Sequence, residues 1–175
     1  MTPTALHLHT TRCLLASLRP LLVLAACASL ALPAQALPER LDDSSSPRSQ
    51  VTTPLQWLSD SEGNATVATA RTRIEYRLAT ARYAGKTARV FFVIPALVPG
   101  VINPSALQVE WRGQGLVSQG RARLGERTLV WSGTVPGPWL TDILDLTLQL
   151  DSSGVRLPAG MPLRFEPYFE IEVFP

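Results

Sequence analysis

Hydrophobic and polar residues alternate along several short segments of the chain. In residues 71–81, Ile74, Tyr76 and Leu78 alternate with charged side chains, and in residues 141–151 four leucines alternate with polar residues. A period of two places successive side chains on opposite faces of a β-strand. The pattern therefore predicts strands with one buried face and one solvated face.

Other segments extend this pattern to about seven or eight short strands. Residues 88–94 are apolar on both faces, which favours a central, buried strand. In residues 163–174, Glu170 and Glu172 are expected to face solvent, with Phe169 and Ile171 facing inward. Further strands are predicted within residues 107–112, 116–124 and 127–132, and an edge strand within 51–58, where Pro54 lacks an amide proton.

These signals predict an all-β domain over residues 66–175. Turn-forming residues recur about every ten positions, and no long helical period is present. An antiparallel β-sandwich fits best, with immunoglobulin-like topology as one arrangement. A small closed β-barrel is the alternative, because alternation alone does not distinguish the two folds. In either fold we expect the core to contain Phe91, Trp111, Trp131 and Phe165, with Leu129 facing the same way as Trp131.

The first 36 residues have the layout of a secretory signal peptide. An apolar run over residues 21–32 follows two arginines, and Pro33 then leads into the small-x-small triplet 34–36. We expect a peptidase to cut between Ala36 and Leu37. The protein is therefore predicted to be exported to the periplasm or cell envelope.

Cys27 offers a second way in which this leader could be processed. Residues 24–27, Leu-Ala-Ala-Cys, fit the lipobox, in which the cysteine is lipidated and becomes the first residue. The apolar run continues past Cys27, so simple cleavage is favoured over lipidation. A transmembrane span is disfavoured, because Arg19 and Pro20 interrupt the about 20 apolar residues that it needs. Attachment to a membrane is therefore expected only if Cys27 is lipidated.

Removal of the leader would change the chemistry available to the chain. The only histidines and cysteines, His7, His9, Cys13 and Cys27, all precede the cleavage site. The exported chain would have no disulfide, no Ser-His or Cys-His pair, and no imidazole or thiolate ligand for a metal. We therefore predict a protein that is not an enzyme of these classes and that needs no cofactor or metal.

The charge balance argues against a nucleic-acid partner. The chain has 16 basic and 14 acidic residues, but two arginines lie in the leader and every acid follows it. Cleavage would leave equal numbers of each sign. The pI of about 8.8 is therefore not the signature of a nucleic-acid-binding surface.

Residues 37–65 are predicted to form a flexible N-terminal segment that includes the short edge strand. Residues 37–50 are polar and rich in serine, a composition typical of a disordered tether. In the following turn, Asp60, Glu62 and Asn64 offer oxygen atoms at alternate positions. Gly63 is not placed as an EF-hand loop requires, so no calcium site is predicted.

Three features suggest how the protein acts. Trp139 follows the rigid stretch 136–138, Pro-Gly-Pro, and an exposed tryptophan can stack on a sugar or anchor a protein partner. An unpaired edge, at 51–58 or 163–174, could accept a strand from another molecule and so form an oligomer. Glu170 and Glu172 would lie about 6.5–7 Å apart between their Cα atoms, which overlaps the spacing used by glycoside hydrolases.

Taken together, the sequence predicts an exported β-sandwich protein with a non-catalytic binding or assembly role. Its partner would be an envelope protein or a carbohydrate. The alternative is a small carbohydrate-active enzyme that uses paired carboxylates. Adjacent outward-facing acids usually form only a solvated strand face, as do Asp142 and Asp145 at the start of a strand beside a turn, so the binding role is favoured.

Overall fold

The computed structural model describes residues 37–47, 56–59, 65–156 and 163–174. These residues form nine strands and three short 3-10 helices, which confirms the predicted all-β class. The strands are β1 (Glu39–Arg40), β2 (Gln56–Ser59), β3 (Ala65–Ala79), β4 (Thr87–Val93), β5 (Leu107–Gly113), β6 (Gly120–Arg123), β7 (Arg127–Thr134), β8 (Trp139–Asp151) and β9 (Tyr168–Val173). The helices are η1 (Ala81–Tyr83), η2 (Pro104–Ala106) and η3 (Ser152–Gly154).

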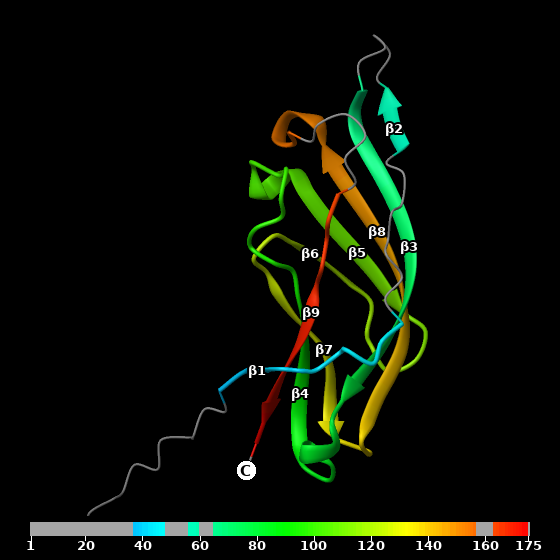
Figure 1. The fold of residues 1–175 in the computed structure, drawn as a ribbon, viewed down its shortest axis with the longest axis vertical. Coiled ribbons are helices and arrows are strands. Elements are labelled where there is room, and N and C mark those ends of the chain that lie inside the picture. Colours follow the sequence, from blue (N-terminus) through cyan, green and yellow to red (C-terminus); the bar gives the residue numbers. More distant parts are fainter. Residues whose placement is uncertain (1–36, 48–55, 60–64, 157–162, 175) are drawn as a thin grey trace, which may run out of the picture. The chain divides into compact units, whose positions relative to one another are not determined.

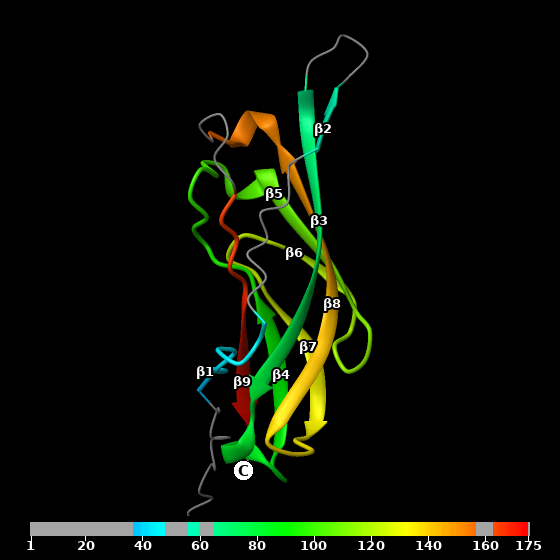
Figure 2. The same ribbon diagram turned by 45° about the vertical axis from the view of Figure 1, so that its right-hand side comes forward.

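The strands form two antiparallel sheets that lie in separate layers (Figures 1 and 2). The four-stranded sheet has the order β1-β9-β4-β7, and the five-stranded sheet has the order β2-β3-β8-β5-β6. Each sheet ends in edge strands, so the strands that the structure describes do not close into a barrel.

The connections between strands repeatedly cross from one sheet to the other. From β3 onward, every connection except β5–β6 makes this crossing. The resulting order is that of a double-sheet jelly roll, with β2 added beside β3. An immunoglobulin-like domain instead keeps its first two strands in one sheet, whereas β1 and β2 of this chain lie in different sheets. The topology thus differs from the immunoglobulin-like arrangement.

Aromatic side chains fill the space between the two sheets. Phe92 of β4 contacts Trp111 of β5, with 4.9 Å between ring centroids. Phe169 of β9 contacts Tyr76 of β3 at the same centroid distance, and both pairs meet edge to face. All four are buried, and Phe165 packs against this core. The packing makes the fold β-sandwich-like and confirms the expected positions of Trp111 and Phe165.

The outer face of the four-stranded sheet differs from the sequence-based expectation. Phe91 lies on this face and not in the core, because its neighbours Val90 and Phe92 take the inward positions of β4. A β-bulge shifts the register so that Phe91 pairs with Leu129 and Val90 pairs with Trp131. The extra residue on β7 turns Leu129 outward while Trp131 packs against the core, so the two do not share a face.

Part of the N-terminal segment 37–47 packs against the sheets. β1 pairs with β9 through Glu39 and Arg40. The next residue, Leu41, is only 1% exposed and belongs to the core. One buried leucine within a polar stretch is enough to dock the segment, and composition alone does not reveal it.

The same segment also contacts the end of β3 in the other sheet. The carbonyl of Asp42 accepts a hydrogen bond of 2.9 Å from the amide of Ala79, and Ser46 Oγ accepts one of 2.9 Å from the amide of Arg77. We call residues 39–46 the N-terminal strap. It joins β9 of one sheet to β3 of the other.

A polar cluster fixes the start of the strap. The carboxylate of Glu39 accepts a hydrogen bond of 2.6 Å from the hydroxyl of Tyr83 and forms an ion pair with Arg82. Burial and the hydrogen bond to Glu39 raise the pKa of Tyr83 to about 12. Tyr83 therefore remains a hydrogen-bond donor to Glu39 at physiological pH.

Of the two segments that the sequence suggested as sheet edges, one lies at an edge and the other does not. β2 lies at the edge of the five-stranded sheet, which confirms the edge assignment for residues 56–59, while 51–55 lie outside the described residues. β9 is shorter than the predicted strand and lies between β1 and β4, so residues 168–173 are not an open edge. β1, at the start of the strap, pairs with Glu170 and Ile171 on the side of β9 that the sequence suggested as a possible open edge.

Candidate functional site

Trp139 opens β8 on the outer face of the five-stranded sheet. Its strand partner is Ala79, the last residue of β3. The side chain of Trp139 is 45% exposed, and Thr141 and Ile143 follow it on the same face. The indole is thus about half exposed, although it opens a strand whose next residue is buried.

A buried threonine holds the turn that precedes Trp139. Thr80 is fully buried, and its hydroxyl donates a hydrogen bond of 2.8 Å to the carbonyl of Gly137. Its amide donates another, also of 2.8 Å, to the carbonyl of Pro138. Two hydrogen bonds from one residue fix the backbone next to Trp139 and so position the indole.

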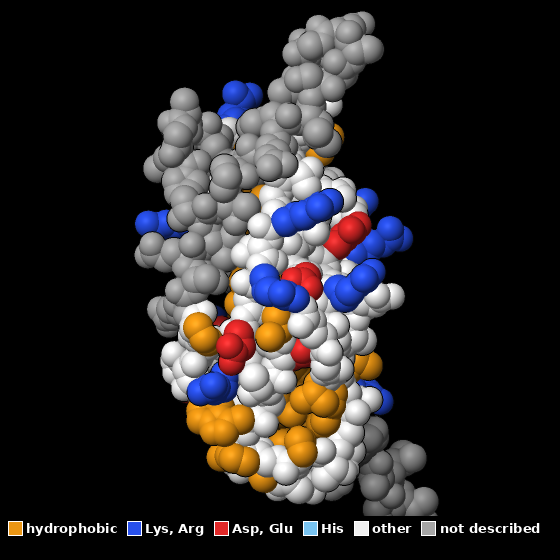
Figure 3. All heavy atoms as spheres, turned by 90° about the vertical axis from the view of Figure 1, so that its right-hand side faces the viewer, with side chains coloured by type: hydrophobic (Ala, Val, Ile, Leu, Met, Phe, Trp, Pro, Cys, Tyr) orange, Lys and Arg blue, Asp and Glu red, His pale blue; other side chains and the backbone are white. Residues whose placement is uncertain are grey.

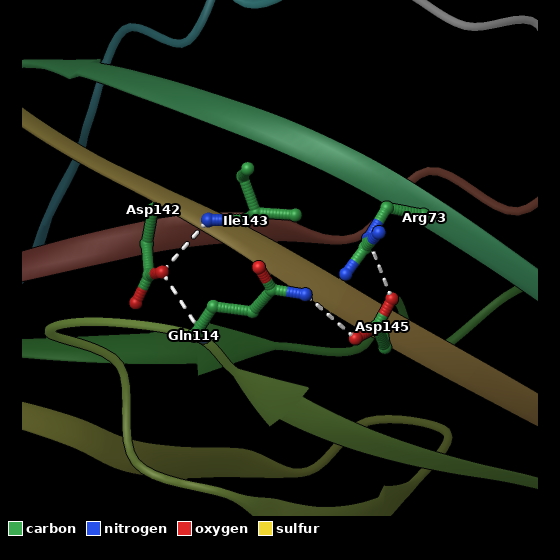
Figure 4. A network of polar contacts seen from close by, with 5 residues as sticks. All are labelled: Arg73, Gln114, Asp142, Ile143 and Asp145. Carbon is green, nitrogen blue, oxygen red and sulfur yellow. Dashed lines mark hydrogen bonds and ion pairs between the residues drawn. The ribbon is translucent and has the colours of Figure 1, made fainter.

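A buried carboxylate organises the neighbouring β5–β6 loop (Figure 4). Asp142 is 7% exposed and accepts hydrogen bonds from three backbone amides. The donors are Gln114 at 3.2 Å, Val117 at 2.7 Å and Ile143 at 2.7 Å. Hydrogen bonds to a charged acceptor are among the stronger ones in proteins, so this carboxylate determines the path of the loop.

Two glycines allow the loop to fold around Asp142. A Cβ atom on Gly113 would lie 2.1 Å from the carbonyl oxygen of Val117, and one on Gly115 would lie 3.3 Å from Oδ1 of Asp142. The next residue, Leu116, is 46% exposed and lines a small pocket together with Thr141. The loop therefore presents a half-exposed leucine beside Thr141, two residues after Trp139 in β8.

Further along β8 from Trp139, the outer face of the five-stranded sheet carries polar and charged side chains. Asp145 pairs with Nε of Arg73 at 2.9 Å and accepts a hydrogen bond of 3.0 Å from the amide group of Gln114 (Figure 4). Figure 3 shows hydrophobic side chains gathered at one end of this face and charged side chains over the rest. The arginines that project from its strands are Arg71, Arg73, Arg77, Arg112, Arg121 and Arg123.

The pocket beside Leu116 is too small for a substrate. Its lining includes Tyr76, Val90, Trp131, Leu140 and Phe169, all apolar or aromatic. The space inside is about 10 Å³, which accommodates roughly one water molecule. Typical ligand pockets measure about 300–1,000 Å³. A ligand at this end of the molecule would therefore bind on the surface.

The paired acids lie on the opposite sheet, on the outer face of β9. Nε of Arg127 contacts Glu170 at 2.8 Å, and Nη2 of the same side chain contacts Glu172 at 2.9 Å. The guanidinium lies over the ring of Phe91, 3.4 Å from its centroid. One arginine thus bridges both carboxylates on a sheet face.

Several expected positions lie outside the described residues. They include Cys27, Ala36 and the oxygen-rich turn 60–64, whereas Leu37 is described and 87% exposed. Among the residues that the structure describes, no three His, Cys, Asp or Glu side chains are grouped so that they could hold a metal ion. No helix in the described part is long and apolar enough to cross a membrane.

No protein-family model, curated protein or solved structure matches this chain. The site is therefore defined by its own geometry. The sequence pointed to Trp139 but not to Leu116 or to the role of Asp142. The amide donors to Asp142 from the β5–β6 loop precede it by 28 and 25 residues, and no local pattern links them.

Proposed function

We propose that the protein is exported to the periplasm or cell envelope and has a non-catalytic binding or assembly role. Its partner, an envelope protein or a carbohydrate, binds at the Trp139 end of the five-stranded sheet. The observation that carries this proposal is the exposure of Trp139, 45% on the sheet face, together with that of Leu116, 46% in the β5–β6 loop, whose pocket also includes Thr141 of the same strand as Trp139.

The rigidity of the surroundings supports a recognition role. Thr80 fixes the backbone before Trp139, and Asp142 fixes the loop that carries Leu116. A surface that is already ordered loses less conformational entropy when it binds. Tryptophan is also among the residues that contribute most to binding energy in protein interfaces.

The polar side chains next to the apolar end support either partner class. The indole of Trp139 can stack on the apolar face of a sugar ring. Gln114, Asp145 and Arg73 offer donors and acceptors within the same face. A protein partner would use the same combination of an aromatic anchor and a polar rim.

Replacing Trp139 by alanine is expected to weaken partner binding strongly. Tagged protein would be incubated with solubilised cell envelope and, separately, with an array of envelope glycans, and bound species would be quantified. The matched control is Leu129→Ala, because Leu129 is 46% exposed on the other sheet. We expect a loss of at least about tenfold for Trp139→Ala and less than twofold for the control. Equal binding by both variants would contradict the proposed site.

The export part of the proposal makes a separate prediction. The protein isolated from cells is expected to begin at Leu37 without modification, because the triplet before it fits a signal peptidase. Intact-mass spectrometry of the purified chain would measure this directly. A chain that begins at Cys27 and carries acyl groups would show a lipoprotein instead, and a chain that retains its leader would contradict export.

A further inference from the structure

The connection between β4 and β5 exposes two aliphatic side chains that the proposed binding site does not use. It spans residues 95–104, Pro-Ala-Leu-Val-Pro-Gly-Val-Ile-Asn-Pro, and contains no charged residue. Leu97 is 88% exposed and Ile102 is 58% exposed. We call this connection the 95–104 loop; it leaves the top of β4 in Figure 1.

The loop is held in place, so this exposure belongs to an ordered structure. Val98 is 4% exposed and belongs to the core. The amide of Ile102 donates a hydrogen bond of 2.9 Å to the carbonyl of Gly154 in η3, and Val101 forms an isolated bridge with Val155. Leu97 and Ile102 thus project from a fixed base.

Part of the backbone of the loop is hydrogen-bonded to the rest of the fold. Pro95, Pro99 and Pro104 have no amide proton. The amide of Val101 donates a hydrogen bond of 3.0 Å to the carbonyl of Val98. The carbonyl of Gly100 accepts a hydrogen bond of 2.7 Å from the amide of Arg156. These hydrogen bonds hold the base of the loop against the neighbouring segments.

The polar side chain of the loop, that of Asn103, also has a hydrogen-bond partner. Asn103 accepts a hydrogen bond of 3.0 Å from the amide of Ser105 at the start of η2. Asp151, the acid at the start of η3, accepts hydrogen bonds from the amide and hydroxyl of Ser153. Arg156 lies beside the loop and is exposed. The loop therefore combines an aliphatic tip with a cation near its base.

We propose that the 95–104 loop binds a lipid bilayer by inserting Leu97 and Ile102 below the headgroups, with Arg156 near the phosphates. Interface hot spots are rich in tryptophan, tyrosine and arginine, and leucine and valine are under-represented there. The tip of this loop has none of the favoured residues. Its aliphatic groups and its flanking arginine match the chemistry of a membrane surface.

The contact differs from an anchor through Cys27. Two aliphatic side chains give weak and reversible binding, because stable attachment usually needs two independent signals. The loop would therefore orient or retain an exported protein at a bilayer without fixing it there. The same contact requires no transmembrane helix.

The test measures cosedimentation with lipid vesicles. The protein is purified as cells process it, and every variant carries Cys27→Ser so that no acyl chain contributes. Vesicles of phosphatidylcholine alone are compared with vesicles that contain one third phosphatidylglycerol. The variants are Leu97→Ser combined with Ile102→Ser, Arg156→Ser, and the control Leu129→Ser, which changes an equally apolar, 46% exposed side chain on another surface.

We expect the double variant to lower the partition coefficient at least tenfold on both vesicles, and the control to change it less than twofold. Arg156→Ser should lower binding about fivefold on the anionic vesicles only. Absence of binding by the parent protein would overturn the proposal, as would equal binding by the parent and the double variant. Self-association that the double variant abolishes, without vesicle binding by the parent, would assign the loop to a protein partner and also overturn it.

Discussion

Replacing Asp142 by alanine is expected to lower the free energy of unfolding by about 3 kcal/mol. The carboxylate accepts hydrogen bonds from the amides of Gln114, Val117 and Ile143, and it is only 7% exposed. Without it, amides at a buried site lose their acceptor, and each such loss costs about 1–3 kcal/mol. Water entering the vacated space would recover part of this cost. Urea denaturation followed by circular dichroism would give the difference.

The control for this variant is Asp145→Ala. Asp145 lies three residues further along β8, but its side chain is 47% exposed and its partners are the side chains of Arg73 and Gln114. An exposed ion pair contributes about 0–1 kcal/mol, so this control should remain near the parent. Similar losses for the two variants would show that Asp142 does not hold the loop.

The Asp142 variant also tests whether the loop matters for binding. Loosening residues 113–117 would let Leu116 leave its place at the Trp139 end of the sheet. We therefore expect weaker partner binding in the fraction that remains folded. On the outer face of the four-stranded sheet, in contrast, Arg127 forms ion pairs with both Glu170 and Glu172.

The alternation of hydrophobic residues predicted much of the fold because it is a local property of each strand. It placed Tyr76 and Leu78 inward on β3 and Phe169 and Ile171 inward on β9, as the structure has them. It did not predict which strands pair, because pairing joins residues far apart in the chain. The crossing of consecutive strands between sheets, and with it the jelly-roll order, has no local signature.

The errors at single residues have the same origin. Phe91 is apolar but lies outside the core, because Val90 and Phe92 take the inward positions of β4, and Arg127 from another strand covers its ring. Asp142 at the start of β8 seemed an ordinary strand residue, because its partners lie in a distant loop. The exposure of Trp139 could be expected because its signal, a tryptophan directly after Pro-Gly-Pro, is entirely local. The bulge in β7, which separates Leu129 from Trp131, lacks such a signal.

The N-terminal strap is the feature that changes the domain boundary most. It precedes residue 66 by twenty or more positions, yet it pairs with β9 and its Leu41 is part of the core. The predicted cleavage site lies directly before this part of the chain. An exported protein that begins at Leu37 would thus keep the whole strap, with Leu37 itself in solvent at 87% exposure.

Replacing Leu41 by alanine should therefore cost about 3 kcal/mol of unfolding free energy, the usual effect of truncating a fully buried leucine. Leu37→Ala is the matched control, since it makes the same change four residues earlier at an exposed site and should cost less than about 0.5 kcal/mol. Urea denaturation compares the two. Hydrogen exchange at the amide of Ala79, which donates to Asp42, separates local release of the strap from global unfolding. Equal stability of both variants, with Ala79 equally protected, would mean that the strap does not contribute to the fold.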